Sequence, residues 1–166
     1  MRKLKLPIIA AAIALFTISN AYAQSEADSK EPHHHHHHHA NEIGIANAPS
    51  YFINEKEWAY SLHLHYIRGI GHSKFGVGIG YERIFGDHKH NTFGLVGAYH
   101  PIDPVTVIVS PGFTFEDKLS QSMFALHIET SYDFDVGHFH MGPVLEFAYD
   151  PEDIHISLGL HIGFGF

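Results

Sequence analysis

The segment from Ile154 to Phe166 alternates without exception between large apolar residues and small or polar ones. Side chains of a β-strand point alternately to its two faces, so a period of two residues identifies a strand rather than a helix. One face of this strand would carry Ile154, Ile156, Leu158, Leu160, Ile162, Phe164 and Phe166. The other face would carry only histidine, serine and glycine. The segment therefore predicts a strand with one bulky apolar face and one small or polar face.

The same alternation recurs upstream, between short groups of turn residues. It is clear in residues 58–67, 75–82, 124–132 and 138–149, and weaker in residues 92–100 and 105–115. A first strand near residues 43–53 is ambiguous in register because of Asn47 and Pro49. Turn residues fall at 54–56, 69–73, 86–87, 101–104, 116–120, 133–137 and 150–153. The pattern predicts an all-β fold, an eight-stranded antiparallel barrel over residues 42–166.

The composition of the two faces predicts which one lies inside the barrel. Opposite the bulky apolar residues stand mostly glycine, alanine, serine and histidine, which suit the narrow interior of eight strands. The apolar face would then contact lipid, with an interfacial girdle of Tyr60, Tyr66, Tyr81, Tyr99, Tyr132 and Tyr149. This favours a transmembrane barrel. A soluble barrel with its apolar face inward is the alternative, although its outer face should carry more charged residues.

The N-terminal part predicts export. A basic start is followed by the apolar run Leu6–Ile18 and by Ala21-Tyr22-Ala23, so residues 1–23 resemble a signal peptide. Residues 24–41 contain no large apolar side chain and are predicted to be a disordered, histidine-rich linker. The chain has no cysteine, which excludes a lipoprotein anchor. Its formal charge of −8 excludes the basic surface that nucleic-acid binding requires.

With these features the chain resembles the small outer-membrane barrels of the OmpA transmembrane-domain and OmpX kind. The resemblance covers residues 42–166, and it includes a closing strand that ends in Phe166. It implies an outer-membrane location with the histidine-rich segment in the periplasm, contact with lipid, and folding by the outer-membrane assembly machinery. It implies no particular activity, because this fold carries many functions.

Histidine is the outstanding feature of the composition, with 18 residues. Seven are consecutive, His33, His34, His35, His36, His37, His38 and His39, and offer many pairs of imidazole ligands for zinc, copper or nickel. An added affinity tag is the other interpretation of this run. His88 and His90 flank Lys89 in an expected turn and predict a looser surface site.

Further histidines fall on the predicted lumen side of the strands: His63, His65, His100, His127, His138, His140, His155 and His161. The pairs His63/His65 and His138/His140 would each point to one side of a strand, as in zinc sites built on sheets. The predicted lumen ligands are His63, His65, His127, His138, His140, His161 and Glu129, with Glu146 as an orienting group. The sequence thus favours an outer-membrane barrel, not an enzyme, that binds or buffers divalent metal and passes it to, or withholds it from, a periplasmic partner.

Two other functions remain open at this stage. The histidines could only pack and hydrogen-bond inside a structural or surface-interaction barrel. Alternatively, His155 and Ser157 have the His-x-Ser spacing of a lipopolysaccharide acyl hydrolase, with Glu146 on the preceding strand.

Overall fold

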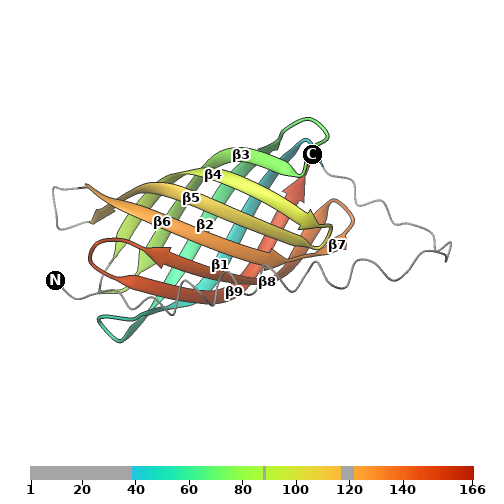
Figure 1. Cartoon of the computed structure of the whole chain (residues 1–166). Coiled ribbons are helices and arrows are strands. Elements are labelled where there is room, and N and C mark those ends of the chain that lie inside the picture. Colours follow the sequence, from blue (N-terminus) through green and yellow to red (C-terminus); the bar gives the residue numbers. More distant parts are fainter. Residues whose placement is uncertain (1–38, 88, 117–121) are drawn as a thin grey trace, which may run out of the picture. The chain divides into compact units, whose positions relative to one another are not determined.

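A computed structural model describes residues 39–87, 89–116 and 122–166. Within these ranges the chain forms the strands β1 (Asn41–Phe52), β2 (Glu57–Gly69), β3 (Phe75–Phe85), β4 (His90–Ile102), β5 (Val105–Glu116), β6 (Ser122–Tyr132), β7 (Phe134–Val136), β8 (Phe139–Tyr149) and β9 (Ile154–Gly165). In this part of the chain no helix is long and apolar enough to cross a membrane. Figure 1 shows the strands strongly tilted around a common interior.

The sheet closes on itself. Each strand from β1 to β5 pairs antiparallel with the next, β1 also pairs with β9, β9 pairs with β8, and β8 pairs with β6, which closes the sheet. β6 and β7 keep the same register against β8, from Leu126 opposite Tyr149 to Val136 opposite Phe139. The ladder is interrupted at Tyr132 and Asp133, opposite Pro143 and Gly142, and Pro143 has no amide hydrogen to donate. Because β6 and β7 lie end to end against β8, the nine segments form eight barrel strands. The predicted eight-stranded antiparallel barrel is confirmed.

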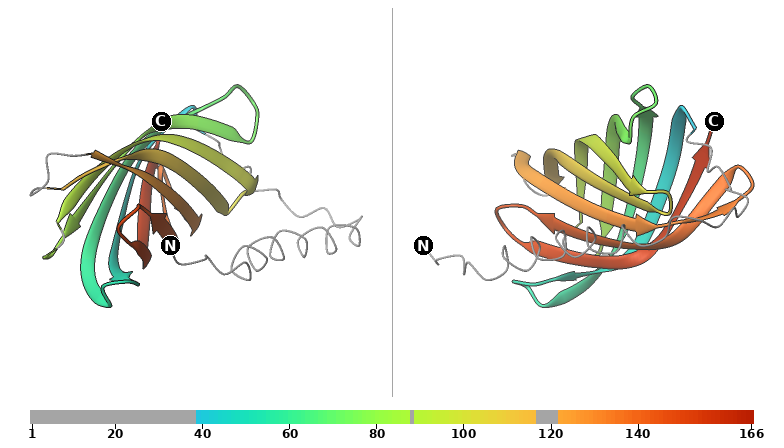
Figure 2. Two further views of the ribbon diagram at one scale, coloured as in Figure 1. Left: turned by 60° about the vertical axis from the view of Figure 1, so that its left-hand side comes forward. Right: turned by 45° about the vertical axis from the view of Figure 1, so that its right-hand side comes forward.

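The chain enters and leaves the barrel at the same end. The amide of Asn41 donates to the carbonyl of Phe166 at 3.0 Å, and the amide of Phe166 donates back at 2.9 Å. We call this the terminal end; the turns at 70–74, 103–104 and 137–138 lie there too. The opposite, far end carries the hairpins between β1 and β2 and between β8 and β9. Figure 2 shows the closed wall of strands from two further sides.

The bulky apolar residues face outward, as the alternation predicted. Leu95 is 67% exposed, Leu158 63% and Ile79 62%, while the residues between them in each strand are buried or small. In β1 the ambiguous register is resolved: Ala48 and Ser50 are buried and Pro49 is exposed. A soluble barrel would bury its large apolar residues, so that alternative is wrong.

Aromatic side chains gather toward both ends of the barrel. At the terminal end Phe75 packs on Tyr99 with ring centroids 5.0 Å apart, and at the far end Tyr51 packs on Trp58 at 5.1 Å. The hydroxyl of Tyr66 donates to Asn41 at 2.8 Å. Aromatic rings with a polar tip are typical of membrane interfaces.

The interior is divided between apolar and polar side chains. Ile67, Val96, Ala98 and Ile108 form an apolar cluster between β2, β4 and β5. The rest of the lumen holds histidines and carboxylates from β1, β2, β3, β6, β8 and β9. The fold therefore brings histidines from distant parts of the sequence into one narrow space.

Candidate metal centre

The structure buries most of the histidines that were predicted to face the lumen. His63, His65, His127, His155 and His161 are each at most 4% exposed. His140 is half-buried, and so is His100, whose Nδ1 lies 3.1 Å from the Thr106 hydroxyl.

Two histidines, His90 and His138, lie elsewhere than predicted, and only the last residue of the histidine tract, His39, is described. The lumen placement of His138 is wrong: β8 begins one residue later, so His138 lies in the turn and is exposed. The surface placement of His90 is also wrong, because His90 begins β4 and is buried. Residues 33–38 lie outside the described residues, as do the predicted signal peptide and His88; His39 is described.

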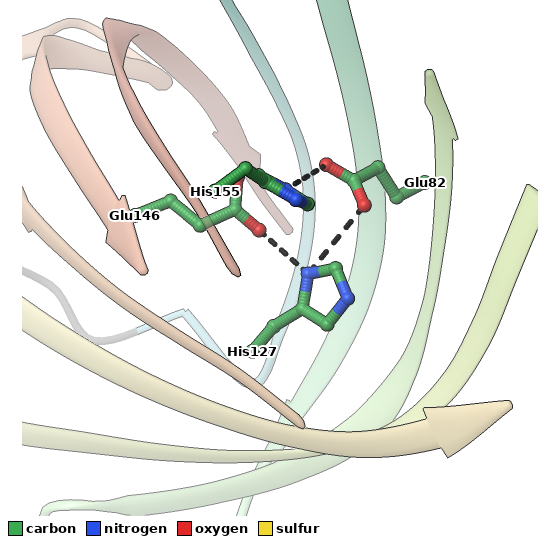
Figure 3. Close-up of side chains that lie close together, drawn as sticks. All are labelled: Glu82, His127, Glu146 and His155. Carbon is green, nitrogen blue, oxygen red and sulfur yellow. Dashed lines mark hydrogen bonds and ion pairs between the residues drawn. The ribbon is translucent and has the colours of Figure 1, made fainter. Parts of the chain in front are cut away.

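Four side chains that could ligate a metal converge in the far half of the lumen, from β3, β6, β8 and β9. One ligand atom from each of Glu82, His127, Glu146 and His155 lies within 4.8 Å of the others. His127 Nδ1 is 2.7 Å from Glu146 Oε1 and 3.5 Å from Glu82 Oε2, and His155 Nε2 is 3.6 Å from Glu82 Oε1. Figure 3 shows the four groups pointing at one another. We call this the four-residue site.

The spacing of these atoms fits a tetrahedral ion. Ligands bonded to zinc at about 2.0–2.1 Å in tetrahedral geometry are about 3.3 Å apart. The separations of 3.5 and 3.6 Å, each to a different oxygen of Glu82, are close to that value, and the 2.7 Å contact between His127 and Glu146 is a hydrogen bond that a bound ion would replace. Both oxygens of Glu82 and the Nε2 of His155 are buried and have no hydrogen-bond partner among the described residues. Buried polar atoms are normally satisfied, and a cation between them would supply the missing interaction.

Glu129 lies directly opposite Glu146 in the β6–β8 ladder but has a different partner, and its buried Oε1 has no hydrogen-bond partner among the described residues. Like charges in such a pair repel. Glu146 turns to His127, whereas Glu129 Oε2 accepts a hydrogen bond of 2.9 Å from His63 Nδ1 on β2. His63, His65 and Glu129 form a second group of possible ligands. The predicted His63/His65 pair therefore faces the lumen together, but each ring meets a different carboxylate.

A third group lies at the terminal end. Glu42 Oε2 is 3.5 Å from His140 Nε2, and Glu42 Oε1 is 3.3 Å from His65 Nε2 and 4.0 Å from His161 Nε2. Nδ1 of His161 donates to Asp133 at 2.9 Å, which leaves its buried Nε2 without a hydrogen-bond partner in the described part of the chain. This carboxylate–histidine pair is the arrangement that orients metal-bound imidazoles. Glu42, His140 and His161 form this third group of possible ligands, and His65 of the second group contacts the same Glu42 carboxylate; we call these four residues the terminal-end site.

Glycine on neighbouring strands makes room for these rings. A Cβ at Gly44 would lie 2.1 Å from His65 Nε2 and 2.7 Å from His161 Nε2. A Cβ at Gly163 would lie 2.0 Å from His140 Nε2. The glycines that alternate with apolar residues in β1 and β9 therefore leave the space that the imidazole rings occupy.

The charge of the lumen also favours a cation. Among the described residues, the ion-pair partners of Glu42, Glu82, Glu129 and Glu146 are histidines, and neither lysine nor arginine pairs with them. Metal ligation requires neutral imidazoles, and with neutral imidazoles these carboxylates would have no other cationic partner among the described residues. A divalent cation bound by two carboxylates and two neutral imidazoles gives a site without net charge, which lowers the cost of burial.

The serine does not meet the requirements of an acyl hydrolase in this structure. The Ser157 hydroxyl lies 2.7 Å from the Ser50 hydroxyl and is buried in the lumen. His155 Nε2 is directed at Glu82, so the expected activation of Ser157 by His155 is not formed. Both residues also face away from the apolar outer surface.

Glu42, Glu82 and Asp133 were missed as site residues by reasoning from the sequence. Each lies on a small or polar face of an otherwise apolar strand, or directly after one, and an acidic residue there is costly unless it has a partner. An acidic residue at such a position was the signal in the sequence that could have identified these three residues. Their partners were not predictable, because the stagger of the strands decides which inward residues share a level.

Comparison with known proteins identifies the fold. No protein-family model matches the chain, and no curated protein matches it by sequence. Among solved structures, Neisserial surface protein A matches with a TM-score of 0.52 and 12% identity, covering 76% of this chain and 96% of that protein. Ail, the attachment invasion locus protein of Yersinia pestis, matches with a TM-score of 0.52 and 14% identity over 76% and 97%.

A de novo designed transmembrane β-barrel matches with a TM-score of 0.51 and 10% identity, covering 74% of this chain and 94% of the design. The chain has the fold of the small outer-membrane β-barrels. This confirms the fold that the resemblance to OmpX-like barrels implied. At sequence identities of 10–14% the similarity extends to the fold alone and not to the histidine-lined lumen.

Proposed function

We propose that this protein is an outer-membrane barrel that binds a divalent transition metal inside its lumen. The observation that carries the proposal is the four-residue site. Two imidazole nitrogens and two carboxylate oxygens lie within 4.8 Å of one another there, and Glu82 and His155 offer buried atoms that lack a hydrogen-bond partner in the described part of the chain.

The mixed nitrogen and oxygen ligands favour zinc, with copper or nickel as competitors. Imidazole suits all three ions, and carboxylate completes common zinc sites. The histidine tract at residues 33–39 would add a second, looser group of ligands. Together they would buffer metal, or pass it to a periplasmic partner.

The exposed apolar belt supports an outer-membrane location. The outward positions of the long strands carry mostly exposed apolar side chains, and the closed ladder satisfies the backbone groups that lipid cannot. The proposed orientation places Asn41 and Phe166, and hence the histidine tract, on the periplasmic side. The outer-membrane assembly machinery would recognise the final strand and the Phe166 that follows it.

The test is calorimetric titration of the barrel, folded in lipid nanodiscs, with zinc, copper and nickel. Residues 33–39 are first replaced by glutamine, which removes the tract as a ligand while keeping the chain length. We expect tight zinc binding to persist in this protein, and to weaken by about 10–100-fold or more when Glu82→Gln and His155→Asn are added.

The matched control is Thr114→Val, which removes a buried lumen hydroxyl that is bonded to Thr92 at 2.8 Å. It should leave zinc binding unchanged. Loss of all binding with the tract would contradict the proposal. It would instead favour a structural barrel whose histidines only hydrogen-bond.

A further inference from the structure

The lumen imidazoles form a continuous column between the two ends of the barrel. Successive ring centroids are 5.4 Å apart from His140 to His161, 5.2 Å from His161 to His65 and 5.7 Å from His65 to His63. The column continues at 6.2 Å from His63 to His127 and 5.9 Å from His127 to His155. The terminal-end site and the four-residue site are therefore joined by neighbouring rings.

The two ends of this column differ in access. At the far end Phe52, only 3% exposed, covers the column: its ring centroid is 4.8 Å from that of His155. Ile84, fully buried, lies in the same half of the lumen. At the terminal end the side chains of Glu42 and His140 remain 18% and 17% exposed. Buried His90 also lies at the far end, with its ring centroid 6.2 Å from that of Phe52 and 6.4 Å from that of His155. A cation from solvent therefore meets part-exposed ligands at the terminal end, whereas the groups at the far end, Phe52 and His90, are buried.

His39 places the end of the histidine tract beside this entrance. A Cβ on Gly165 would lie 2.0 Å from His39 Cδ2, and a Cβ on Gly163 would lie 2.0 Å from His140 Nε2. The two imidazoles thus rest over neighbouring inward positions of β9. The His39 ring is also 6.2 Å from that of His138 in the adjacent turn.

We propose that the terminal-end site of Glu42, His65, His140 and His161 is a second metal site, through which a divalent cation enters the lumen from the side of the histidine tract and reaches the four-residue site. The inference rests on the proposed function. Three imidazoles and one carboxylate form the ligand set, and Asp133 orients His161. The His63–Glu129 pair is the intermediate step, because the His63 ring centroid lies 5.7 Å from that of His65 in the terminal-end site and 6.2 Å from that of His127 in the four-residue site.

The experiment compares zinc stoichiometry and loading rate in nanodiscs, using protein in which residues 33–38 are glutamine and His39 is kept. Calorimetry gives the number of sites, and stopped flow with a zinc-sensitive dye gives the rate. The terminal-end variant is Glu42→Gln with His140→Asn. The second variant is Glu42→Gln alone, which keeps the size of the side chain. Phe52→Ala opens the far end.

We expect the terminal-end variant to lose one zinc equivalent, to keep the equivalent held by the four-residue site, and to load it at least about tenfold more slowly. Glu42→Gln alone should show the same changes to a smaller degree. Phe52→Ala should leave the loading rate unchanged. Unchanged stoichiometry and rate in the Glu42→Gln proteins, or faster loading in Phe52→Ala, would overturn this inference. Failure of the proposed function looks different: Glu82→Gln with His155→Asn would then retain every equivalent.

Discussion

Asp133 accepts a hydrogen bond of 2.9 Å from Nδ1 of His161, although the two residues are 28 positions apart. Asp133 sits in the break between β6 and β7, opposite Gly142 and beside Pro143, and its carboxylate continues the inward alternation of β6. The bond fixes the His161 ring with Nε2 directed toward Glu42. A residue that the sequence marks as a turn therefore orients a candidate ligand.

Asp133→Asn should weaken zinc binding at the terminal-end site by about 10–100-fold, the usual effect of removing a carboxylate that supports a metal-bound histidine. Calorimetry on the protein with residues 33–38 replaced by glutamine measures this. Asp103→Asn, in the exposed turn between β4 and β5, is the control and should have no effect. Equal affinities for the two variants would mean that the Asp133–His161 bond only stabilises the fold.

Glu82 and Glu129 should respond in opposite ways to loss of charge in metal-free protein. Glu82 is buried and accepts no hydrogen bond among the described residues, whereas Glu129 accepts one from His63 at 2.9 Å. Glu82→Gln removes a buried charge whose ion-pair partners among the described residues, His127 and His155, lie 3.5 and 3.6 Å away, and it should raise the free energy of unfolding by about 1–3 kcal/mol. Glu129→Gln should lower it by a similar amount. Urea unfolding in lipid vesicles with a chelator measures both, and destabilisation by Glu82→Gln would show that Glu82 is a structural ion-pair partner.

Gly44→Ala should damage the terminal-end site without changing any ligand. Its methyl group would approach His65 Nε2 to 2.1 Å and His161 Nε2 to 2.7 Å, so both rings must move. Gly97→Ala is the matched control, because its Cβ would meet only the Val109 carbonyl at 3.7 Å, an ordinary contact. We expect one zinc equivalent to be lost in Gly44→Ala and none in Gly97→Ala. Retention of that equivalent in folded Gly44→Ala protein would count against the ligand set.

Because the apolar residues face outward, the loss of stability caused by a charged residue on this face should depend on its depth in the bilayer. Leu95, 67% exposed near the middle of β4, should lie at the centre of the bilayer, and Ile102, 59% exposed at the end of the same strand, near the interface. Leu95→Arg should lower the free energy of unfolding in lipid by about 2–4 kcal/mol, and Ile102→Arg by about 0–1 kcal/mol. Similar costs at both positions would argue against a membrane-spanning belt.

The sequence predicted the fold well because each strand carries its own period-two signal. The alternation in residues 154–166 placed every side chain on its correct face, and the turns at 54–56 and 150–153 fall where they were predicted. The first strand was ambiguous because Asn47 and Pro49 interrupt its apolar face. Pro49 is tolerated since it points outward, and the ladder of β1 with β9 shows no pairing there.

The candidate site was predictable only in part. Alternation identified His127 and His155 as lumen residues, but it could not show that Glu82, from a strand far away in sequence, stands between them. That contact depends on the stagger of strands around the barrel. His138 was misplaced for a local reason, since a shift of one residue in the start of β8 moves it from the lumen to the turn.

The most direct measurement is anomalous diffraction at the zinc edge from crystals of the folded barrel grown with zinc, with residues 33–39 replaced by glutamine. We predict an anomalous peak within bonding distance of Glu82, His127, Glu146 and His155, at about 2.0–2.2 Å from their ligand atoms. Peaks confined to the outer surface or to crystal contacts, with none between these four residues, would contradict metal binding in the lumen.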